Sequence, residues 1–450
     1  MFEEKIWKQQ AEIVCSVLKK APQFDKDYLL PAEEFKERQA KVWKMLQEQG
    51  YDCGVVYSDE HYCGDVPYLA GNNNIVVEPV AAVLGEKGLY FIAGLESGIV
   101  AEQFCHRSGV RIRKVDLLRV DEADYAPDLL TPCDIVEEAC GKKPQKIALL
   151  TMRGIFPLGL YRVLADYVGA ANIGDLSKAY YRIKYEKSDR EMRLIEEGSQ
   201  IADAMLEGML RILRPGLRES QVAQWGYVIA HELGADDLGF DVMVTTGRNN
   251  RTIVARASNA VIQEGDVVHI GVSPKRDGLC AAERASVVCV KDPAQIPEKH
   301  RIWMEFLKGA FEYSVELFRM IAQTDSPGCL HEQKMIAYYD SKVPELEQKL
   351  GMKLDHFSEL KGYVTSHNSG YTECQEGYGA LSCDFEEPCA HQMVLMLDVG
   401  IKGFRNTWDE IAIPGLDYLV IEKTAGKFGK EVRILNKLPV DLQYLVGEAF

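Results

Sequence analysis

The second half of the chain repeats one order of elements, and this repetition constrains the fold more than any other feature. A pair of stretches with helical apolar spacing precedes three short apolar runs of strand length, and the series occurs twice. The first series comprises residues 188–213, 219–234, 241–246, 267–273 and 283–290. The second comprises residues 298–321, 332–350, 393–399, 406–413 and 418–422. Such repetition predicts two α/β halves that face one another across a shared cleft, where a small ligand can bind.

The first helix of the repeat has a clear start and end. Ser188-Asp189-Arg190-Glu191 is a capping box, in which a hydroxyl and a carboxylate bind free backbone N–H groups. Apolar side chains then recur at helical spacing, namely Met192, Ile195, Ala202, Met205, Met209 and Leu213. Because Pro215-Gly216 cannot continue a helix, we expect the helix to end just before this dipeptide.

The first 178 residues show a different alternation. Helices are expected at 3–20, 31–50, 95–104, 134–139 and 158–167, and strands at 53–57, 80–84, 89–93, 112–115 and 146–151. This alternation is typical of an α/β domain. With 450 residues, of which 47% are hydrophobic, the chain can bury two cores. The expected fold class is α/β, or α+β, with domains at residues 1–178 and 179–450.

Charge and composition exclude several kinds of partner. A net charge of -16 would repel a phosphate backbone, so we expect no nucleic acid. Neither a secretory leader after Met1-Phe2-Glu3 nor an apolar stretch of about 20 residues is recognised, so we expect no membrane partner. The 12 cysteines are scattered without C-x-x-C spacing, which predicts reduced core residues and a cytoplasmic protein. The expected partner is a small molecule.

Several motifs in this order resemble the creatinase, prolidase and aminopeptidase P superfamily. The stretch Tyr181-Arg182-Ile183-Lys184, followed by Lys187-Ser188 and Glu191, is similar to the linker and first helix of that superfamily. Further matches follow in the family order at Gly265-Asp266, Asp277-Gly278, His367, residues 393–400 and Asp409-Glu410. The resemblance covers about residues 31–425. It implies a C-terminal pita-bread domain, an N-terminal creatinase-type domain and a homodimer.

The resemblance also implies that the usual two-metal site is incomplete. Peptidases of this family hold two divalent ions with two aspartates, one histidine and two glutamates. The aspartate positions fall on Gly271 and on or beside Ala282, the histidine is His367, and the glutamates are expected at Asp398 and Asp409. Two carboxylates are thus lost and two others shortened, although metal–ligand distances tolerate only about 0.2 Å of error. We therefore expect no pair of metal ions and no cofactor.

The leading hypothesis is a metal-independent hydrolase or lyase of creatinase type that cleaves a C–N bond in a small polar metabolite. The dipeptide Glu283-Arg284 resembles the creatinase motif. His367 would act as general acid or base, because the unperturbed pKa of histidine lies near neutrality. Asp398 and Asp409 would orient His367 or an attacking water. Glu283 would pair with a cationic group of the substrate.

Four further residues are candidates for substrate contacts. His269 lies two residues before Gly271, and therefore on the same face of a strand. Arg284 adjoins Glu283, and Glu373 or Cys374 stands where the family has a second, substrate-handling histidine. Asn73 lies in a segment that, by the resemblance, would extend over the site of a partner subunit. Three of these residues also have a structural alternative: His269 as a core histidine, Arg284 as a neighbouring charge and Asn73 as a turn residue.

Two other functions stay open. A Xaa-Pro dipeptidase or aminopeptidase would bind one metal ion through His269, His367, Asp398 and Asp409, and metal analysis would distinguish it from the leading hypothesis. A catalytically inert pita-bread module would instead bind a peptide or a protein.

Overall fold

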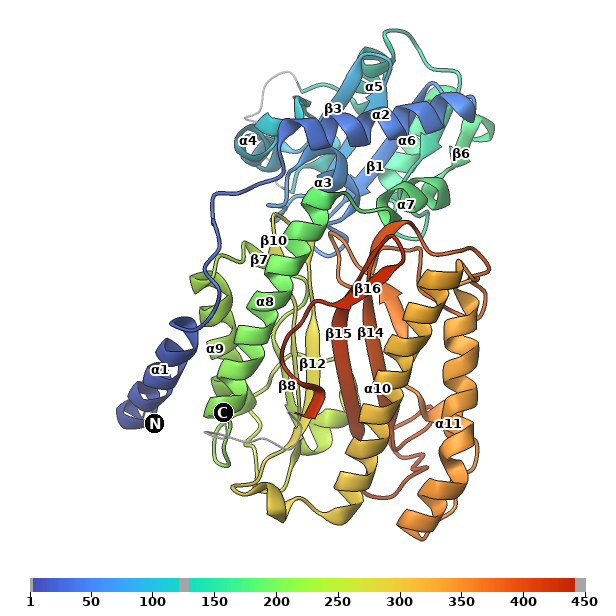
Figure 1. Ribbon diagram of the computed structural model, residues 1–450. Helices are drawn as coiled ribbons and strands as arrows, with labels where there is room; N and C mark the ends of the chain where they lie inside the picture. Colours follow the sequence, from blue (N-terminus) through green and yellow to red (C-terminus); the bar gives the residue numbers. More distant parts are fainter. Residues whose placement is uncertain (1–2, 121–128, 442–450) are drawn as a thin grey trace. The chain divides into compact units, whose positions relative to one another are not determined.

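The computed structural model describes residues 3–120 and 129–441, and the chain divides into two compact units (Figure 1). The large unit comprises Met1–Tyr28, Lys187–Ser369 and Gly379–Phe450, and the small unit comprises Leu29–Glu186 and Gly370–Tyr378. A single boundary after residue 178 is expected from the sequence, whereas the chain passes between these units several times. The first helix belongs to the large unit, where the ring centroids of Trp7 and Trp225 lie 5.4 Å apart with the ring planes tilted by 39°.

The small unit is built on a mixed sheet of order β4-β3-β2-β1-β5-β6. Its strands are β1 (Cys53–Ser58), β2 (Val80–Gly85), β3 (Gly88–Ala93), β4 (Arg111–Lys114), β5 (Ile147–Leu149) and β6 (Ile173–Asp175). Its helices are α2 (Ala32–Glu48), α3 (Asp65–Ala70), α4 (Leu95–Phe104), α5 (Pro132–Cys140), α6 (Leu158–Val168) and α7 (Ser177–Tyr185). Apolar residues of α5 and α6 pack with those of β1, β2 and β3 in one core.

The helices and strands expected in the first 178 residues are confirmed, but α3, β6 and α7 are not expected from the sequence. These elements depend on contacts with distant parts of the chain. Lys184 on α7 is buried and lies 2.9 Å from Asp65 on α3 and 2.9 Å from Glu376. Local periodicity does not reveal a short helix that is held by such ion pairs.

The large unit contains two sheets and five α-helices among its described residues. Its helices are α1 (Glu4–Leu18), α8 (Asp189–Ile212), α9 (Glu219–Glu232), α10 (Glu298–Thr324) and α11 (Cys329–Leu350). The main sheet has the order β13-β14-β15-β12-β9-β8, and β16 pairs with β15. Its strands are β8 (Met243–Thr246), β9 (Val267–Val272), β12 (Glu283–Val288), β13 (Ser366–Asn368), β14 (Gln392–Lys402), β15 (Tyr418–Phe428) and β16 (Glu431–Ile434).

A small second sheet of β7 (Asp237–Leu238), β10 (Pro274–Arg276) and β11 (Leu279–Cys280) adjoins the main sheet in sequence. In Figure 1, α8 and α10 lie against the main sheet, and α9 and α11 are paired with them. The repeated order of helix pair and strands is thereby confirmed. The capping box is confirmed as well, since Ser188 Oγ accepts from Glu191 N at 3.1 Å and the Glu191 carboxylate accepts from Ser188 N at 2.8 Å.

The strand expected at 406–413 is wrong. Between β14 and β15 the described chain forms turns and a single bridge from Phe404 to Ile411. Residues 406–410 are exposed, so the apolar residues that follow them do not enter a ladder.

The twelve cysteines are all free, as expected. However, Cys15, Cys374 and Cys383 are exposed rather than part of a core. Among the helices of the described chain, none combines the length and the apolar character needed to cross a bilayer.

Candidate functional site

The register of the main sheet brings charged side chains from three strands into one row. Arg284 on β12 pairs with Glu422 on β15, and Glu422 in turn pairs with Asp398 on β14. Paired residues in a ladder direct their side chains to the same face of a sheet. His367 on β13 pairs with β14 two positions from Asp398, so its imidazole lies on this face as well. Arg284, Glu422, Asp398 and His367 therefore lie together on one face of the sheet.

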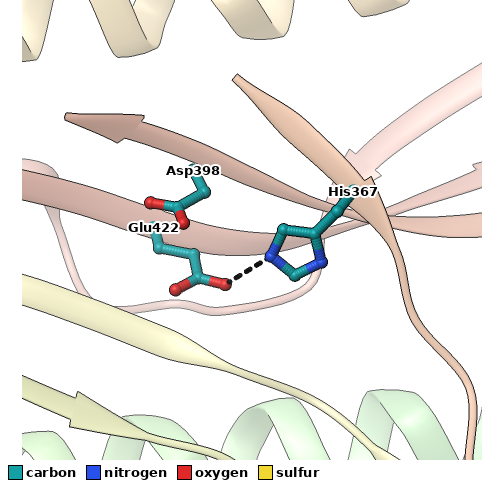
Figure 2. A group of neighbouring side chains, drawn as sticks. All are labelled: His367, Asp398 and Glu422. Carbon is teal, nitrogen blue, oxygen red and sulfur yellow. Dashed lines mark ion pairs between the residues drawn. The ribbon is translucent and has the colours of Figure 1, made fainter. Parts of the chain in front are cut away.

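His367, Asp398 and Glu422 form a compact cluster (Figure 2). One ligand atom from each residue lies within 4.8 Å of the others, and His367 Nε2 is 3.6 Å from Glu422 Oε1. Asp398 is 3% exposed and Glu422 is fully buried, whereas the His367 side chain is 19% exposed. Asp398 Oδ1 is buried and has no hydrogen-bond partner among the described residues. The imidazole is therefore the group of this cluster that a ligand can reach most directly.

The guanidinium of Arg284 lies beside both carboxylates and makes five hydrogen bonds. The acceptors are His269 Nε2 at 3.0 Å, Tyr363 Oη at 2.7 Å, Asp398 Oδ2 at 2.9 Å, the Ile253 carbonyl oxygen at 3.0 Å and Tyr418 Oη at 3.2 Å. A guanidinium has five N–H donors, and each one is used here. Nε also lies 3.5 Å from Glu422 Oε2. Arg284 is thus a fixed, buried cation without a donor left for a substrate, contrary to the expectation that it binds the substrate.

Position 271 makes room for this arginine. Gly271 pairs with Arg284 across β9 and β12, and a Cβ atom at 271 would lie 3.1 Å from Arg284 Cγ. The carbonyl of Ile253 is directed at the guanidinium from a backbone with a φ of 63°, which β-branched residues rarely adopt. Both the missing side chain and the unusual backbone therefore accommodate Arg284.

Burial and Arg284 determine the charge states nearby. Burial raises the pKa of Asp398 to about 6, although the Arg284 cation acts in the opposite direction. Burial, followed by the Arg284 charge, holds the pKa of His269 well below its usual range. His269 is therefore neutral. Because Arg284 can only donate, His269 Nε2 accepts its hydrogen bond and the imidazole proton lies on Nδ1, 3.5 Å from Thr245 Oγ1.

Two residues expected in the site lie elsewhere in the large unit. Glu283 pairs with Lys423 in the ladder and forms a buried ion pair with it on the face of β12 opposite to Arg284, where Asp203 of α8 is its neighbour. Successive side chains of a strand point to opposite faces, so Glu283 does not reach the row that contains His367. Asp409 is exposed on the turn between β14 and β15, and the structure does not bring it to His367.

Two further candidates belong to the small unit. Glu373 is buried in the segment Gly370–Tyr378. Asn73 is partly buried in the segment before β2, where Asn72 Oδ1 accepts from Asn74 N at 3.0 Å. This local hydrogen bond is typical of a turn. A role of either residue in substrate binding stays a prediction.

Glu422, Tyr363 and Tyr418 belong to the cluster but are not among the residues expected from the sequence. A signal for Glu422 is present, because it follows the apolar run Tyr418-Leu419-Val420-Ile421. A carboxylate in a buried strand needs a partner, and the same argument selects Asp398. The two tyrosines carry no such signal, since phenol side chains are common in the cores of strands.

The residues present do not fit a pair of divalent ions. Gly271 offers no carboxylate, and the backbone N–H of Ala282 is bound by Thr424 Oγ1 at 2.9 Å. The Arg284 cation already binds Asp398 Oδ2 and lies close to Glu422. Two carboxylates that share one cation cannot balance four further positive charges. Within the described residues, His367, Asp398 and Glu422 are the one group that could hold a single ion.

Comparisons with known proteins agree with this fold. Residues 193–410 match metallopeptidase family M24. An uncharacterized peptidase, YqhT, of Bacillus subtilis (strain 168) is 22% identical over 232 residues, or 51% of this chain and 63% of that protein. The putative dipeptidase YkvY of the same organism is 23% identical over 249 residues, or 54% of this chain and 62% of that protein. The chain thus spans less than two thirds of the length of these curated relatives.

Solved structures show the same fold over most of the chain. The X-Pro aminopeptidase from Thermotoga maritima MSB8 superimposes with a TM-score of 0.67 at 17% identity, covering 89% of this chain and 98% of that one. The Xaa-Pro dipeptidase from Bacillus anthracis has a TM-score of 0.66 at 18% identity, and the match covers 91% of this chain and 98% of that one. The prolidase from Pyrococcus horikoshii OT3 has a TM-score of 0.67 at 15% identity, and the match covers 90% of this chain and 99% of that one. The chain therefore has a pita-bread fold with a metallopeptidase family M24 region at residues 193–410, and its resemblance to the creatinase, prolidase and aminopeptidase P superfamily is confirmed.

Proposed function

We propose that this chain is a hydrolase that cleaves a C–N bond of a small substrate at the His367 cluster, without a pair of metal ions. The observation that carries this proposal is the guanidinium of Arg284, which uses all five of its donors within the protein and lies against both carboxylates. The similarity to peptidases supports the reaction class, because a peptide bond is an amide C–N bond.

His367 is the proposed general acid and base. Its Nδ1 lies 3.3 Å from the carbonyl oxygen of Asn368, so a proton on Nδ1 leaves the lone pair of Nε2 to accept a proton from an attacking water. Glu422 Oε1, 3.6 Å from Nε2, then stabilises the imidazolium that forms. The imidazolium returns the proton to the leaving nitrogen. Asp398 Oδ1 is a buried acceptor that can bind an N–H group of the substrate.

The charge of the cluster favours a substrate with a neutral or cationic nitrogen group. With ionised Asp398 and Glu422, the single cation of Arg284 leaves one net negative charge beside a neutral His367. An anionic group would be repelled from this face of the sheet. Since Glu283 lies on the opposite face, the expected ion pair between Glu283 and the substrate is replaced here by the two carboxylates of the cluster.

Turnover by metal-free protein tests the proposal. The chelator-treated enzyme should hydrolyse at least one member of a panel of Xaa-Pro dipeptides, amidino compounds and cyclic amidines, and His367→Ala should abolish this activity. His356→Asn, at an exposed site with a left-handed backbone that asparagine tolerates, is the control and should retain activity. Activity that appears only after a divalent ion is added would contradict the proposal.

A second candidate function is a Xaa-Pro peptidase with one metal ion. The close approach of His367, Asp398 and Glu422 within 4.8 Å favours it, as do the names of the relatives. In that case the purified chain would carry one equivalent of metal, and chelation would remove Xaa-Pro cleavage. Metal analysis before any activity assay separates the two candidates.

We also propose that the chain acts as a homodimer in the cytoplasm. The resemblance supports the dimer, and the absence of a disulfide among the twelve cysteines supports a reducing compartment. Light scattering coupled to size-exclusion chromatography tests the dimer, and fractionation of the native cells tests the location.

A further inference from the structure

We infer that Arg284 is a built-in cation that keeps divalent ions out of the His367, Asp398 and Glu422 cluster, and that its removal exposes a site for one divalent ion. The inference concerns cation binding and goes beyond the proposed hydrolysis. Metal binding and turnover are therefore measured separately, and either result can fail without the other.

The buried charge of Arg284 opposes the binding of a divalent ion in the cluster. Arg284 lies 2.9 Å from Asp398 and 3.5 Å from Glu422, and all three side chains are buried. In so little water, a divalent ion among the same carboxylates would be repelled strongly by the guanidinium. Without Arg284, the two carboxylates would carry two uncompensated charges, which a buried site tolerates poorly. One divalent ion would balance both.

Three side chains of the cluster supply ligand atoms for one divalent ion. His367, Asp398 and Glu422 each offer one atom within a 4.8 Å cluster, on three neighbouring strands of one sheet. Asp398 Oδ1 is buried without a partner among the described residues, and Asp398 Oδ2 would be released by the loss of Arg284. Two carboxylates and one imidazole suit Mn²⁺ or Zn²⁺.

The residues around Arg284 fix the position of its guanidinium. Gly271 leaves the space that the stem of Arg284 fills, since a Cβ atom there would lie 3.1 Å from Arg284 Cγ. The Ile253 carbonyl and the hydroxyls of Tyr363 and Tyr418 complete the set of acceptors around the guanidinium. The surrounding structure therefore holds the cation in a fixed position, as a resident ion would be held.

Mn²⁺ titration of full-length protein tests the inference. Mn²⁺ is the probe because it avoids the exposed thiols of Cys15, Cys374 and Cys383, which would bind softer ions. By calorimetry, the native chain should bind Mn²⁺ more weakly than about 1 mM. Arg284→Ala should bind one equivalent at least about a hundredfold more tightly, and the double variant Arg284→Ala/His367→Ala should lose this binding.

Arg276→Ala is the matched control. Arg276 is also a buried arginine of the large unit, with bonds to Glu197 and to two backbone carbonyls, but it lies outside the cluster. This variant should bind Mn²⁺ no better than the native chain. Equal gains in Arg276→Ala and Arg284→Ala would show nonspecific binding and would overturn the inference.

Arg284→Gln provides a second measurement if the alanine variant does not fold. A ligand that binds only the folded state raises the melting temperature, so Mn²⁺ should raise the Tm of Arg284→Gln and leave that of the native chain unchanged. One tightly bound Mn²⁺ per native chain, or no Mn²⁺ effect on either folded variant, would overturn the inference.

Discussion

Glu283 and Arg284 are neighbours in sequence but belong to two separate ion pairs on opposite faces of β12. The antiparallel ladder sets Glu283 against Lys423 and Arg284 against Glu422, so each acid of one strand meets the base of the other. One pair adjoins Asp203 of α8, and the other belongs to the His367 cluster. The two faces of one strand thus separate a structural charge pair from the candidate site.

Lys423→Met should destabilise the large unit, because it leaves Glu283 buried without its cation. The expected loss in the free energy of unfolding is about 3 to 5 kcal/mol. Burial already raises the pKa of Glu283 well above its usual range, although Lys423 opposes this shift. The double variant Glu283→Gln/Lys423→Met should recover most of the loss in urea denaturation. A double variant as unstable as Lys423→Met would contradict the assignment of this pair.

Gly271→Ala should destabilise the chain by about 1 to 3 kcal/mol, because the added Cβ presses on the stem of Arg284. Gly154→Ala is the matched control, since a Cβ at 154 meets no atom within 4 Å. Thermal unfolding of both variants measures the difference. If both substitutions lower the free energy of unfolding equally, the contact between Arg284 and position 271 does not cause the loss.

His331 should make stability depend on pH between about 4 and 6.5. Burial between α10 and α11, where Ser314 Oγ lies 3.0 Å from His331 Nε2, lowers the pKa of His331 to about 4. The unfolded chain therefore binds more protons than the folded chain in this range, so the free energy of unfolding falls as the pH is lowered. The contribution is about 3 kcal/mol at pH 4.

Urea denaturation at pH 7 and at pH 5 measures this effect. His331→Gln removes the titrating group and should flatten the pH dependence, even though the lost hydrogen bond lowers stability at pH 7. A variant with the same slope as the native chain would show that other groups cause the acid sensitivity.

Lys184→Met should loosen the small unit and the segment Gly370–Tyr378 that belongs to it. Lys184 is 3% exposed and lies 2.9 Å from both Asp65 and Glu376, so the substitution removes the cation beside two buried carboxylates. A loss of about 3 to 5 kcal/mol is expected. Hydrogen exchange should show faster exchange at residues 370–378, whereas an equal substitution at exposed Lys8 should not. Unchanged exchange in this segment would refute the role of Lys184.

Much of the fold could be predicted from the sequence because the signals are local. The capping box at Ser188 sets the start of α8, apolar periodicity gives the four helices of the repeat, and apolar runs give β9, β12, β14 and β15. Asp398 and His367 stand out for the same reason, since a charged residue in an apolar strand and a histidine beside a polar turn are visible in a short window.

Tertiary structure alone decided which of the charged residues share a site. Whether Glu283 or Arg284 faces His367 depends on the register of β12 with β15, and a shift of one residue would exchange the two faces. That Glu422 and not Asp409 belongs to the cluster depends likewise on where β14 ends and on the turn that follows it. The pairing of β12 with β15 joins residues more than a hundred positions apart, so its register follows from packing of the whole sheet and not from any local pattern.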